Sequence, residues 1–172
     1  MSYLIPECLE TPRLVLRQFR EDDWRDLYLL YSDEETTRYT IRRVLNEDDS
    51  WRTMVMMMGH WQLRGYGPYA VEEKSSGRVI GHIGLWYPWA WPELEIMWSL
   101  ARDCWGKGFA SEAAKAVKKM AHQVMPNVPF ISLIDVNNHR SRKLAESLGA
   151  RMEKEIVFKE HPSCIYRHIF DA

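Results

Sequence analysis

The 172-residue sequence is poor in cysteine, in net charge and in long apolar runs. Its three cysteines, Cys8, Cys104 and Cys164, are an odd number at wide spacing, which excludes a disulfide framework and a CxxC metal site. We therefore expect a reducing, cytoplasmic setting. The formal net charge of −1 excludes the strong basic field that would draw the whole chain to nucleic acid or to an anionic membrane.

Other absences narrow the class of protein further. The uncharged stretch at 83–92 contains two prolines and is far shorter than the about 20 residues that a membrane span needs. The N-terminus lacks a basic segment followed by an apolar one, so we expect no signal peptide. The 6 histidines show no HxxxH or HExxH spacing, so we predict no metal site. With 46% hydrophobic and 27% charged residues, the chain is expected to form one globular domain over residues 1–172.

The spacing of apolar residues predicts both strands and helices. Alternation of apolar and polar residues predicts strands at 13–17, 69–73, 78–86, 93–100, 130–135, 152–158 and 165–170. Apolar residues three and four apart, with capping residues at the ends, predict helices at 24–31, 46–65, 109–124 and 138–149. The order is not a strict βαβ alternation. We therefore expect an α/β (α+β) fold with a mixed, largely antiparallel twisted sheet of six to seven strands and about four helices.

The segment 105–112, between a predicted strand and a predicted helix, is the most informative stretch of the chain. Gly106 and Gly108 let several backbone N–H groups converge without obstruction by side chains, and the helix that follows adds its dipole. This pattern predicts a site for a phosphate or diphosphate. A P-loop does not fit, because Lys107 is followed by glycine, and a dinucleotide fingerprint does not fit, because Ser111 replaces its third glycine. A plain strand-to-helix turn is the alternative.

Charge is distributed unevenly along this nearly neutral chain. Residues 102–119 and 137–154 each carry five basic and two acidic residues, whereas 7–35 carry nine acidic and four basic ones. The excess of cations around the glycine turn favours an anionic ligand there, although solvated surfaces alone would give the same asymmetry.

Four motifs follow one another in an order that resembles a known enzyme family. They are Glu95–Leu100, Trp105–Ala113, Asn138–Ser141 and Leu148–Ala150, and with the opening Leu9–Arg17 they extend over nearly the whole chain. Together they resemble the GNAT superfamily of N-acetyltransferases. Within it they are most similar to the RimJ/RimL branch, which contains the ribosomal-protein-alanine N-acetyltransferases.

The resemblance implies that two central strands, 93–100 and 130–135, splay apart and hold acetyl-CoA, a co-substrate, between them. The residues implied in its binding are Trp98, Leu100, Trp105, Gly106, Lys107, Gly108, Ala110, Ser111 and Asn138. The backbone N–H groups of the glycine turn would bind the diphosphate, with Lys107 and either Arg140 or Arg142 as counter-charges. The turn of the family usually begins with Gln or Arg, whereas this chain has Trp105, as is usual in the RimJ/RimL-like branch.

Acetyl transfer to an amine requires loss of a proton from the amine, stabilisation of an oxyanion and protonation of the departing thiolate. Ser141 precedes Leu144, Ala145 and Leu148 by 3, 4 and 7 residues, so it shares the apolar face of its predicted helix. The resemblance implies that Ser141 is the general acid and that Asn138 binds the pantetheine arm. The alternative is that Asn138 only caps the helix and Ser141 only occupies its first turn.

Two carboxylates compete for the role of general base. Glu95 lies on the strand before the glycine turn, where many family members carry a base that acts through water. Glu160 follows Ser141 at the distance of a glutamate used in the RimL-like branch. Glu93 shares a strand face with Glu95 and is the third candidate.

The acceptor side is marked by aromatic residues. Trp86, Trp89 and Trp91 lie on a proline-containing loop that would wall an acceptor cleft, contact a second subunit or fold onto the core. We expect the acceptor to be a primary amine, on a protein N-terminus or a small molecule, and the protein to be a monomer or a homodimer. The alternative function is a catalytically idle GNAT fold that binds CoA or a partner.

Overall fold

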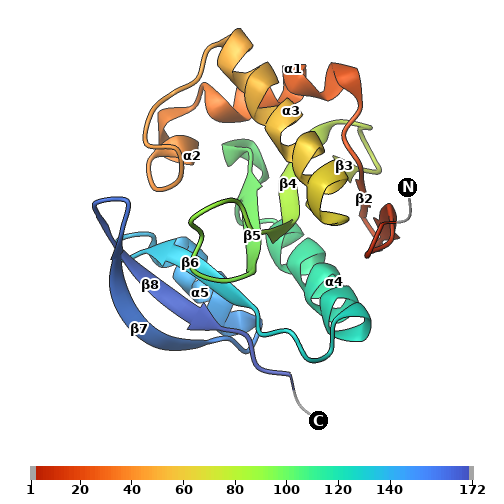
Figure 1. Cartoon of the computed structure of the whole chain (residues 1–172). Coiled ribbons are helices and arrows are strands. Elements are labelled where there is room, and N and C mark those ends of the chain that lie inside the picture. Colours follow the sequence, from red (N-terminus) through yellow and green to blue (C-terminus); the bar gives the residue numbers. More distant parts are fainter. Residues whose placement is uncertain (1–2, 171–172) are drawn as a thin grey trace.

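The computed structural model describes residues 3–170 and contains one eight-stranded sheet in the order β1-β2-β3-β4-β5-β6-β8-β7 (Figure 1). The strands are β1 (Cys8–Glu10), β2 (Leu14–Arg17), β3 (Pro68–Glu73), β4 (Val79–Trp86), β5 (Glu95–Leu100), β6 (Ile131–Asp135), β7 (Arg151–Phe158) and β8 (His161–Arg167). The helices are α1 (Trp24–Tyr31), α2 (Glu34–Thr37), α3 (Glu47–Arg64), α4 (Phe109–Val124) and α5 (His139–Ser147), with short 3-10 turns at Glu21–Asp23 and Arg102–Cys104.

The predicted fold class is confirmed, but the predicted counts were slightly low. The additional elements are β1 and α2, which have three and four residues and are too short to show a periodic pattern. The last strand, predicted at 165–170, was also misplaced by a few residues. It begins at His161, directly after a two-residue turn from β7, and ends at Arg167.

Both faces of the sheet are covered by helices, and the alternation along β4 shows which helix covers which face. Ile83 and Leu85 pack in one apolar cluster with Ala113 and Val117 of α4, whose small side chains permit close approach. Trp86 points to the other face and packs in a second cluster that contains Leu27 and Leu30 of α1 and Met54 and Met57 of α3. The core therefore has two layers, one on each side of the central strands.

The helix ends follow the predicted capping chemistry. The Asn46 side chain accepts the Asp49 N–H at 2.8 Å, and α3 ends at Gly65, which has a φ of 74°. The Asn138 side chain accepts the Ser141 N–H at 3.2 Å and so caps α5. No helix within residues 3–170 has both the length and the apolar character needed to cross a bilayer.

The junction between β5 and β6 is the unusual feature of the sheet. All other neighbouring strands run antiparallel, whereas β5 and β6 run parallel and share a single paired position, Glu95 with Ile131. Beyond that pair the two strands diverge (Figure 1). The sheet is thus almost divided at its centre, as the resemblance of the sequence motifs to the GNAT superfamily implied.

Candidate active site

Beyond the backbone contact at the Glu95–Ile131 pair, where the Ile131 N–H donates to the Leu94 carbonyl at 3.0 Å, side chains bridge the gap between β5 and β6. The Ser132 hydroxyl donates to the Ile96 carbonyl at 2.7 Å, and the Leu133 N–H donates to the Glu95 carboxylate at 3.0 Å. Because the single hydroxyl hydrogen of Ser132 is used in this way, the His168 Nε2–H donates to Ser132 Oγ, at 2.9 Å. These buried bridges fix the separation of the strands.

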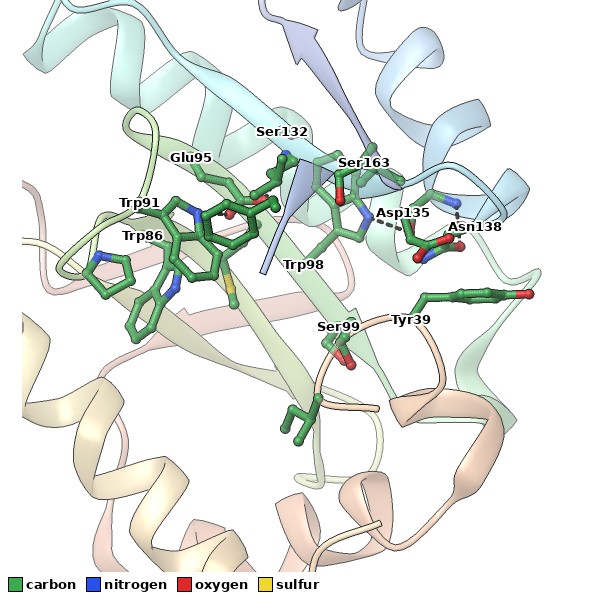
Figure 2. A pocket seen from close by; sticks show the side chains of 18 of the residues that line it. Tyr39, Trp86, Trp91, Glu95, Trp98, Ser99, Ser132, Asp135, Asn138 and Ser163 are labelled. Atoms are coloured by element: carbon green, nitrogen blue, oxygen red, sulfur yellow. Dashed lines mark hydrogen bonds between the residues drawn. The ribbon is translucent and has the colours of Figure 1, made fainter. Parts of the chain in front are cut away.

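Two cavities meet at this gap. The larger has a volume of about 580 Å³ and the smaller a volume of about 320 Å³. The residues that line both are Tyr39, Thr40, Trp98, Ser99, Asn138 and Ser141. Figure 2 shows Trp86, Trp91 and Glu95 at one end of the larger cavity, Asp135 and Asn138 at the other, and Trp98 between them. A ligand in one cavity would therefore meet a ligand in the other beside Trp98 and Ser141.

The glycine turn adopts the backbone that its sequence requires. Gly106 and Gly108 have φ values of 74° and 80°, a left-handed conformation that disfavours any residue with a Cβ. Gly108 caps α4 without a side-chain hydrogen bond, so the first N–H groups of the helix are left for another acceptor. Trp105 and Ala110, at the two ends of the turn, line the smaller cavity. This arrangement can receive an anion.

The surroundings of the turn hold it in place. The Trp105 indole N–H donates to the Leu100 carbonyl at 2.8 Å, and the Arg140 guanidinium lies 3.7 Å above the Trp105 ring. Thus the tryptophan that replaces the usual polar residue anchors the turn and brings a cation to it. On the opposite side, Arg13 donates to the Lys107 carbonyl at 2.9 Å and pairs with Glu112 at 2.7 Å.

Ser141 lies in the first turn of α5, and its hydroxyl lines both cavities. The Trp98 indole N–H donates to Ser141 Oγ at 3.2 Å. No contact among the described residues uses the hydroxyl hydrogen of Ser141, so this hydrogen can be donated to a ligand. Asn138 caps the helix through its side-chain oxygen, which leaves its amide N–H groups available in the same place.

Glu95 lies at the floor of the larger cavity and is only 6% exposed. One carboxylate oxygen accepts the Leu133 N–H at 3.0 Å and the other accepts the Trp91 indole N–H at 2.7 Å. Burial raises the pKa of Glu95 to about 7, against the opposing effect of these two hydrogen bonds. A carboxyl group with this pKa can both accept and release a proton near neutrality.

The other two candidate bases lie elsewhere. Arg167 holds Glu93 through two hydrogen bonds of 2.5 and 2.8 Å, and this pairing lowers the pKa of Glu93. Glu160 is exposed in the turn between β7 and β8, where its φ is 69°. Neither side chain lines either cavity. Of the three carboxylates, only Glu95 lines the larger cavity, which Ser141 also lines.

The tryptophan-rich loop divides into buried and exposed parts. Trp86 and Trp91 line the larger cavity in a T-shaped contact with ring centroids 6.5 Å apart. His60 stacks on Trp86 at 4.6 Å and accepts the Tyr87 N–H at 3.1 Å, which fixes the start of the loop. Trp89 lies at the rim of the cavity and is 92% exposed. The expectation of a cavity wall is thus met by two of the three tryptophans.

Several residues of the cavity carried no signal in the sequence. They are Tyr39, Arg42, His82, Asp135 and Lys159, which come from separate segments of the chain. Arg42 forms an ion pair with Asp135 across 93 residues of sequence, and Tyr31 hydrogen-bonds His82 at 2.7 Å. Only the topology brings these pairs together, so no local motif could have identified them. Within residues 3–170, no group of three His, Cys, Asp or Glu side chains is placed to hold a metal.

Comparisons with known proteins agree with this geometry. Residues 13–151 match the acetyltransferase (GNAT) domain family. The N-acetyltransferase p20 of Bacillus licheniformis, an uncharacterized protein, is 30% identical over 149 residues, which cover 86% of this chain and 84% of that protein. The N-acetyltransferase YnaD of Bacillus subtilis, also uncharacterized, is 26% identical over 145 residues, which cover 84% of this chain and 83% of that one.

Solved structures show the same fold. An acetyltransferase from Agrobacterium tumefaciens superimposes with a TM-score of 0.84 at 24% identity, over 99% of this chain and 98% of that one. A ribosomal-protein-alanine acetyltransferase from Vibrio fischeri superimposes with a TM-score of 0.75 at 13% identity, over 94% of this chain and 96% of that one. The family match, the relatives and the divided sheet lead to one conclusion: the chain belongs to the GNAT family of acetyltransferases.

Proposed function

We propose that the protein transfers the acetyl group of acetyl-CoA to a primary amine by direct attack within a ternary complex. The observation that carries this proposal is the meeting of two cavities at one shared wall beside Ser141, with Glu95 lining the larger of the two. One cavity begins at the glycine turn and suits the co-substrate. The other is walled by aromatic residues and suits the acceptor.

On the co-substrate side, the residues present fit acetyl-CoA. The backbone amides from Gly106 to Ser111 would bind the diphosphate, with Lys107 and Arg140 as nearby cations. The backbone of Trp98–Leu100, which has no partner on β6, would pair with the pantetheine arm together with the Asn138 amide. Together, these backbone and side-chain groups would position the thioester at the shared wall.

On the acceptor side, Glu95 would take the proton from the amine through a water molecule. Its pKa of about 7 leaves it ionised at mildly alkaline pH, where a protonated amine must still lose a proton before it can attack. Backbone N–H groups along the diverging part of β5 would stabilise the oxyanion. Ser141, oriented by the Trp98 indole, would donate its hydrogen to the departing thiolate.

The finer assignment is to the RimJ/RimL branch, with a protein N-terminus or a small-molecule amine as acceptor. It is supported by the opening motif Leu9–Arg17 and by the fold shared with the Vibrio fischeri enzyme. We place the protein in the cytoplasm, because its cysteines Cys8, Cys104 and Cys164 are all free, as is usual in a reducing compartment. We expect it to be a monomer or a homodimer.

The proposal is tested by titration calorimetry with acetyl-CoA and by release of CoA thiol in the presence of a panel of amines. We expect binding of acetyl-CoA and amine-dependent thiol release. Ser141→Ala should lower kcat by about tenfold or more while the affinity for acetyl-CoA is unchanged, because the side chain acts on the leaving group. A protein that binds acetyl-CoA but releases no thiol with any amine would instead be the catalytically idle module. Absence of binding at millimolar acetyl-CoA would overturn both functions.

A further inference from the structure

Backbone strain in this protein gathers around the larger cavity. Among residues 3–170, four non-glycine residues have a positive φ: Arg42 (63°), Ala90 (65°), Lys159 (46°) and Glu160 (69°). Arg42 and Lys159 line the larger cavity, Ala90 lies between lining residues Trp89 and Trp91, and Glu160 lies between lining residues Lys159 and His161. The left-handed conformation is unfavourable for side chains with a Cβ and persists where the surrounding structure enforces it, typically at ligand sites. Three separate loops are thus held in strained conformations at one rim.

The walls of this cavity suit an apolar group. Phe158 and Trp91 meet edge to face with ring centroids 4.8 Å apart, and Trp86 packs against Trp91 on its other side. Met56 and Met57 of α3 add flexible apolar surface. Transfer of a ligand with an aliphatic or aromatic body from water to this wall would therefore be favourable.

One cation that lines the cavity has no carboxylate partner among the described residues. Arg42 is paired with Asp135, and both oxygens of Glu95 accept hydrogen bonds. Lys159, by contrast, has no carboxylate partner within residues 3–170. Its ammonium lies 4.8 Å from the centroid of Trp91 and 5.5 Å from that of Phe158. The turn at 159–160, with its two positive φ angles, thus holds a cation without a carboxylate partner beside the rings of Trp91 and Phe158.

Lys159 and Glu95 contact the same indole. The Trp91 N–H donates to Glu95, and the Trp91 ring lies under the Lys159 ammonium. The two groups are therefore separated by roughly the size of one side chain. This spacing suits one small molecule that carries both an amine, directed to Glu95, and an anion, directed to Lys159.

We propose that the acceptor is a free amino acid with an apolar side chain, whose carboxylate pairs with Lys159 while its side chain packs on the wall formed by Trp86, Trp91 and Phe158. This inference rests on the proposed acetyl transfer and narrows it. A protein N-terminus presents an amide where a free amino acid presents its carboxylate, so it cannot form the ion pair.

The test compares each amino acid with its own amide. Methionine, leucine and phenylalanine and their C-terminal amides are assayed by thiol release with wild-type protein, Lys159→Met and Lys159→Arg. Because the amine of the amide has a different pKa, the readout is the acid-to-amide ratio of kcat/KM, compared between variants. The control is Lys154→Met, since Lys154 is an exposed residue of β7 that does not line the cavity.

We expect the acid-to-amide ratio to fall roughly tenfold or more in Lys159→Met, which is the effect of losing one charge-assisted hydrogen bond, and to be kept in Lys159→Arg and Lys154→Met. A ratio unchanged in Lys159→Met, or wild-type turnover of peptides with free N-termini at the rate of amino acids, would overturn the amino-acid assignment and leave the transferase function intact. Thiol release with neither member of any pair, although other amines of the panel are acetylated, would overturn the amino-acid assignment alone, whereas thiol release with no amine at all would count against the transferase function itself. Calorimetry with amino acids on the CoA-saturated protein gives the same comparison without turnover.

Discussion

The two ends of the cleft are built in different ways. The end that would receive the diphosphate is formed by the backbone of one contiguous segment, 105–111, in which two left-handed glycines expose N–H groups. The acceptor end is formed by side chains from six segments, which include α1, α3, the loop before α3, and the β4–β5 and β7–β8 connections. A site in which backbone groups bind the ligand tolerates changes of side chain. A site in which loop side chains bind the ligand can change its specificity with few substitutions. The first end suits a constant co-substrate and the second a variable acceptor.

The sharpest test of this division is Glu95→Gln. We expect kcat to fall about 10²–10³-fold with little change in the affinity for acetyl-CoA, because the group acts on the amine and not on the co-substrate. In the wild type, kcat should rise as the pH passes through about 7, since the base must be ionised, and this rise should disappear in the variant. The measurements are pH–rate profiles and calorimetry.

Glu160→Gln is the matched comparison for that experiment. Because Glu160 lies in an exposed turn outside both cavities, we expect its pH–rate profile to follow that of the wild type. The reverse result, a large loss in Glu160→Gln and none in Glu95→Gln, would move the base to the β7–β8 turn.

At the co-substrate end, Gly106→Ala can be paired with Gly77→Ala. Both glycines have a similar positive φ, 74° and 69°, and in both an added Cβ would meet no atom within 4 Å. Both variants should therefore lose a similar stability, about 1 kcal/mol. Only Gly106→Ala should weaken acetyl-CoA binding, by about tenfold, because only its backbone would hold the diphosphate. Equal binding in the two variants would argue against the glycine turn as the anion site.

At the acceptor end, Trp91→Phe tests the environment of the base. The indole N–H lowers the pKa of Glu95, so its removal should raise that pKa and shift the pH–rate midpoint upward by about one unit. Trp89→Phe, a change on the same loop at a side chain that is 92% exposed, should leave the midpoint in place. A shift in both variants would indicate a general effect on the loop.

The smallest expected effect concerns stability in acid. Burial lowers the pKa of His82, beside the cavity, and of His168, behind the Ser132 bridge, to about 4. Between pH 6.5 and about 4 the unfolded chain binds protons at these two histidines that the folded chain does not, so the histidines lower the stability as the pH falls, whereas the raised pKa of Glu95 acts in the opposite direction. Each histidine should cost about 0.8 kcal/mol between pH 7.5 and pH 6.

The free energy of unfolding is measured by urea denaturation of the wild type, His82→Gln and His168→Gln at pH 7.5 and at pH 6. The two histidines contribute about equally to the change in the free energy of unfolding between these pH values, so each variant should lose about half of their joint contribution. If only His168→Gln does so, the ring of His82 is open to water through the cavity.

The sequence predicted one end of the cleft better than the other for a physical reason. Gly106, Gly108 and the small-residue face of α4 are local features, because a left-handed turn and a close helix packing each require particular residues at adjacent or regularly spaced positions. Ser141 was predicted to lie on the apolar face of its helix, and it does line the cavities. Which of the candidate carboxylates enters the cavity depends on the positions of strands that are remote in sequence, and it was therefore left open.

The acceptor wall was predicted only in part. The three tryptophans at 86–91 indicated an unusual loop, but nothing in the sequence shows that Trp91 contacts Phe158 and Lys159, which lie far from it along the chain. A positive φ at a non-glycine residue such as Arg42 or Lys159 also leaves no trace in the sequence, because it is imposed by tertiary contacts.

The single backbone pair between β5 and β6 divides the chemistry as well as the sheet. Glu95 belongs to the N-terminal block of strands, whereas Ser141 follows β6 and belongs to the C-terminal block. Their alignment depends on a few contacts across the gap, from the Ile131 N–H to the Leu94 carbonyl, from the Leu133 N–H to the Glu95 carboxylate and from the Ser132 hydroxyl to the Ile96 carbonyl. Removal of the Ser132 hydroxyl would weaken this junction, and the proton acceptor and the proton donor would move apart although neither had been altered. Activity can therefore be lost through a change that never touches a reacting group.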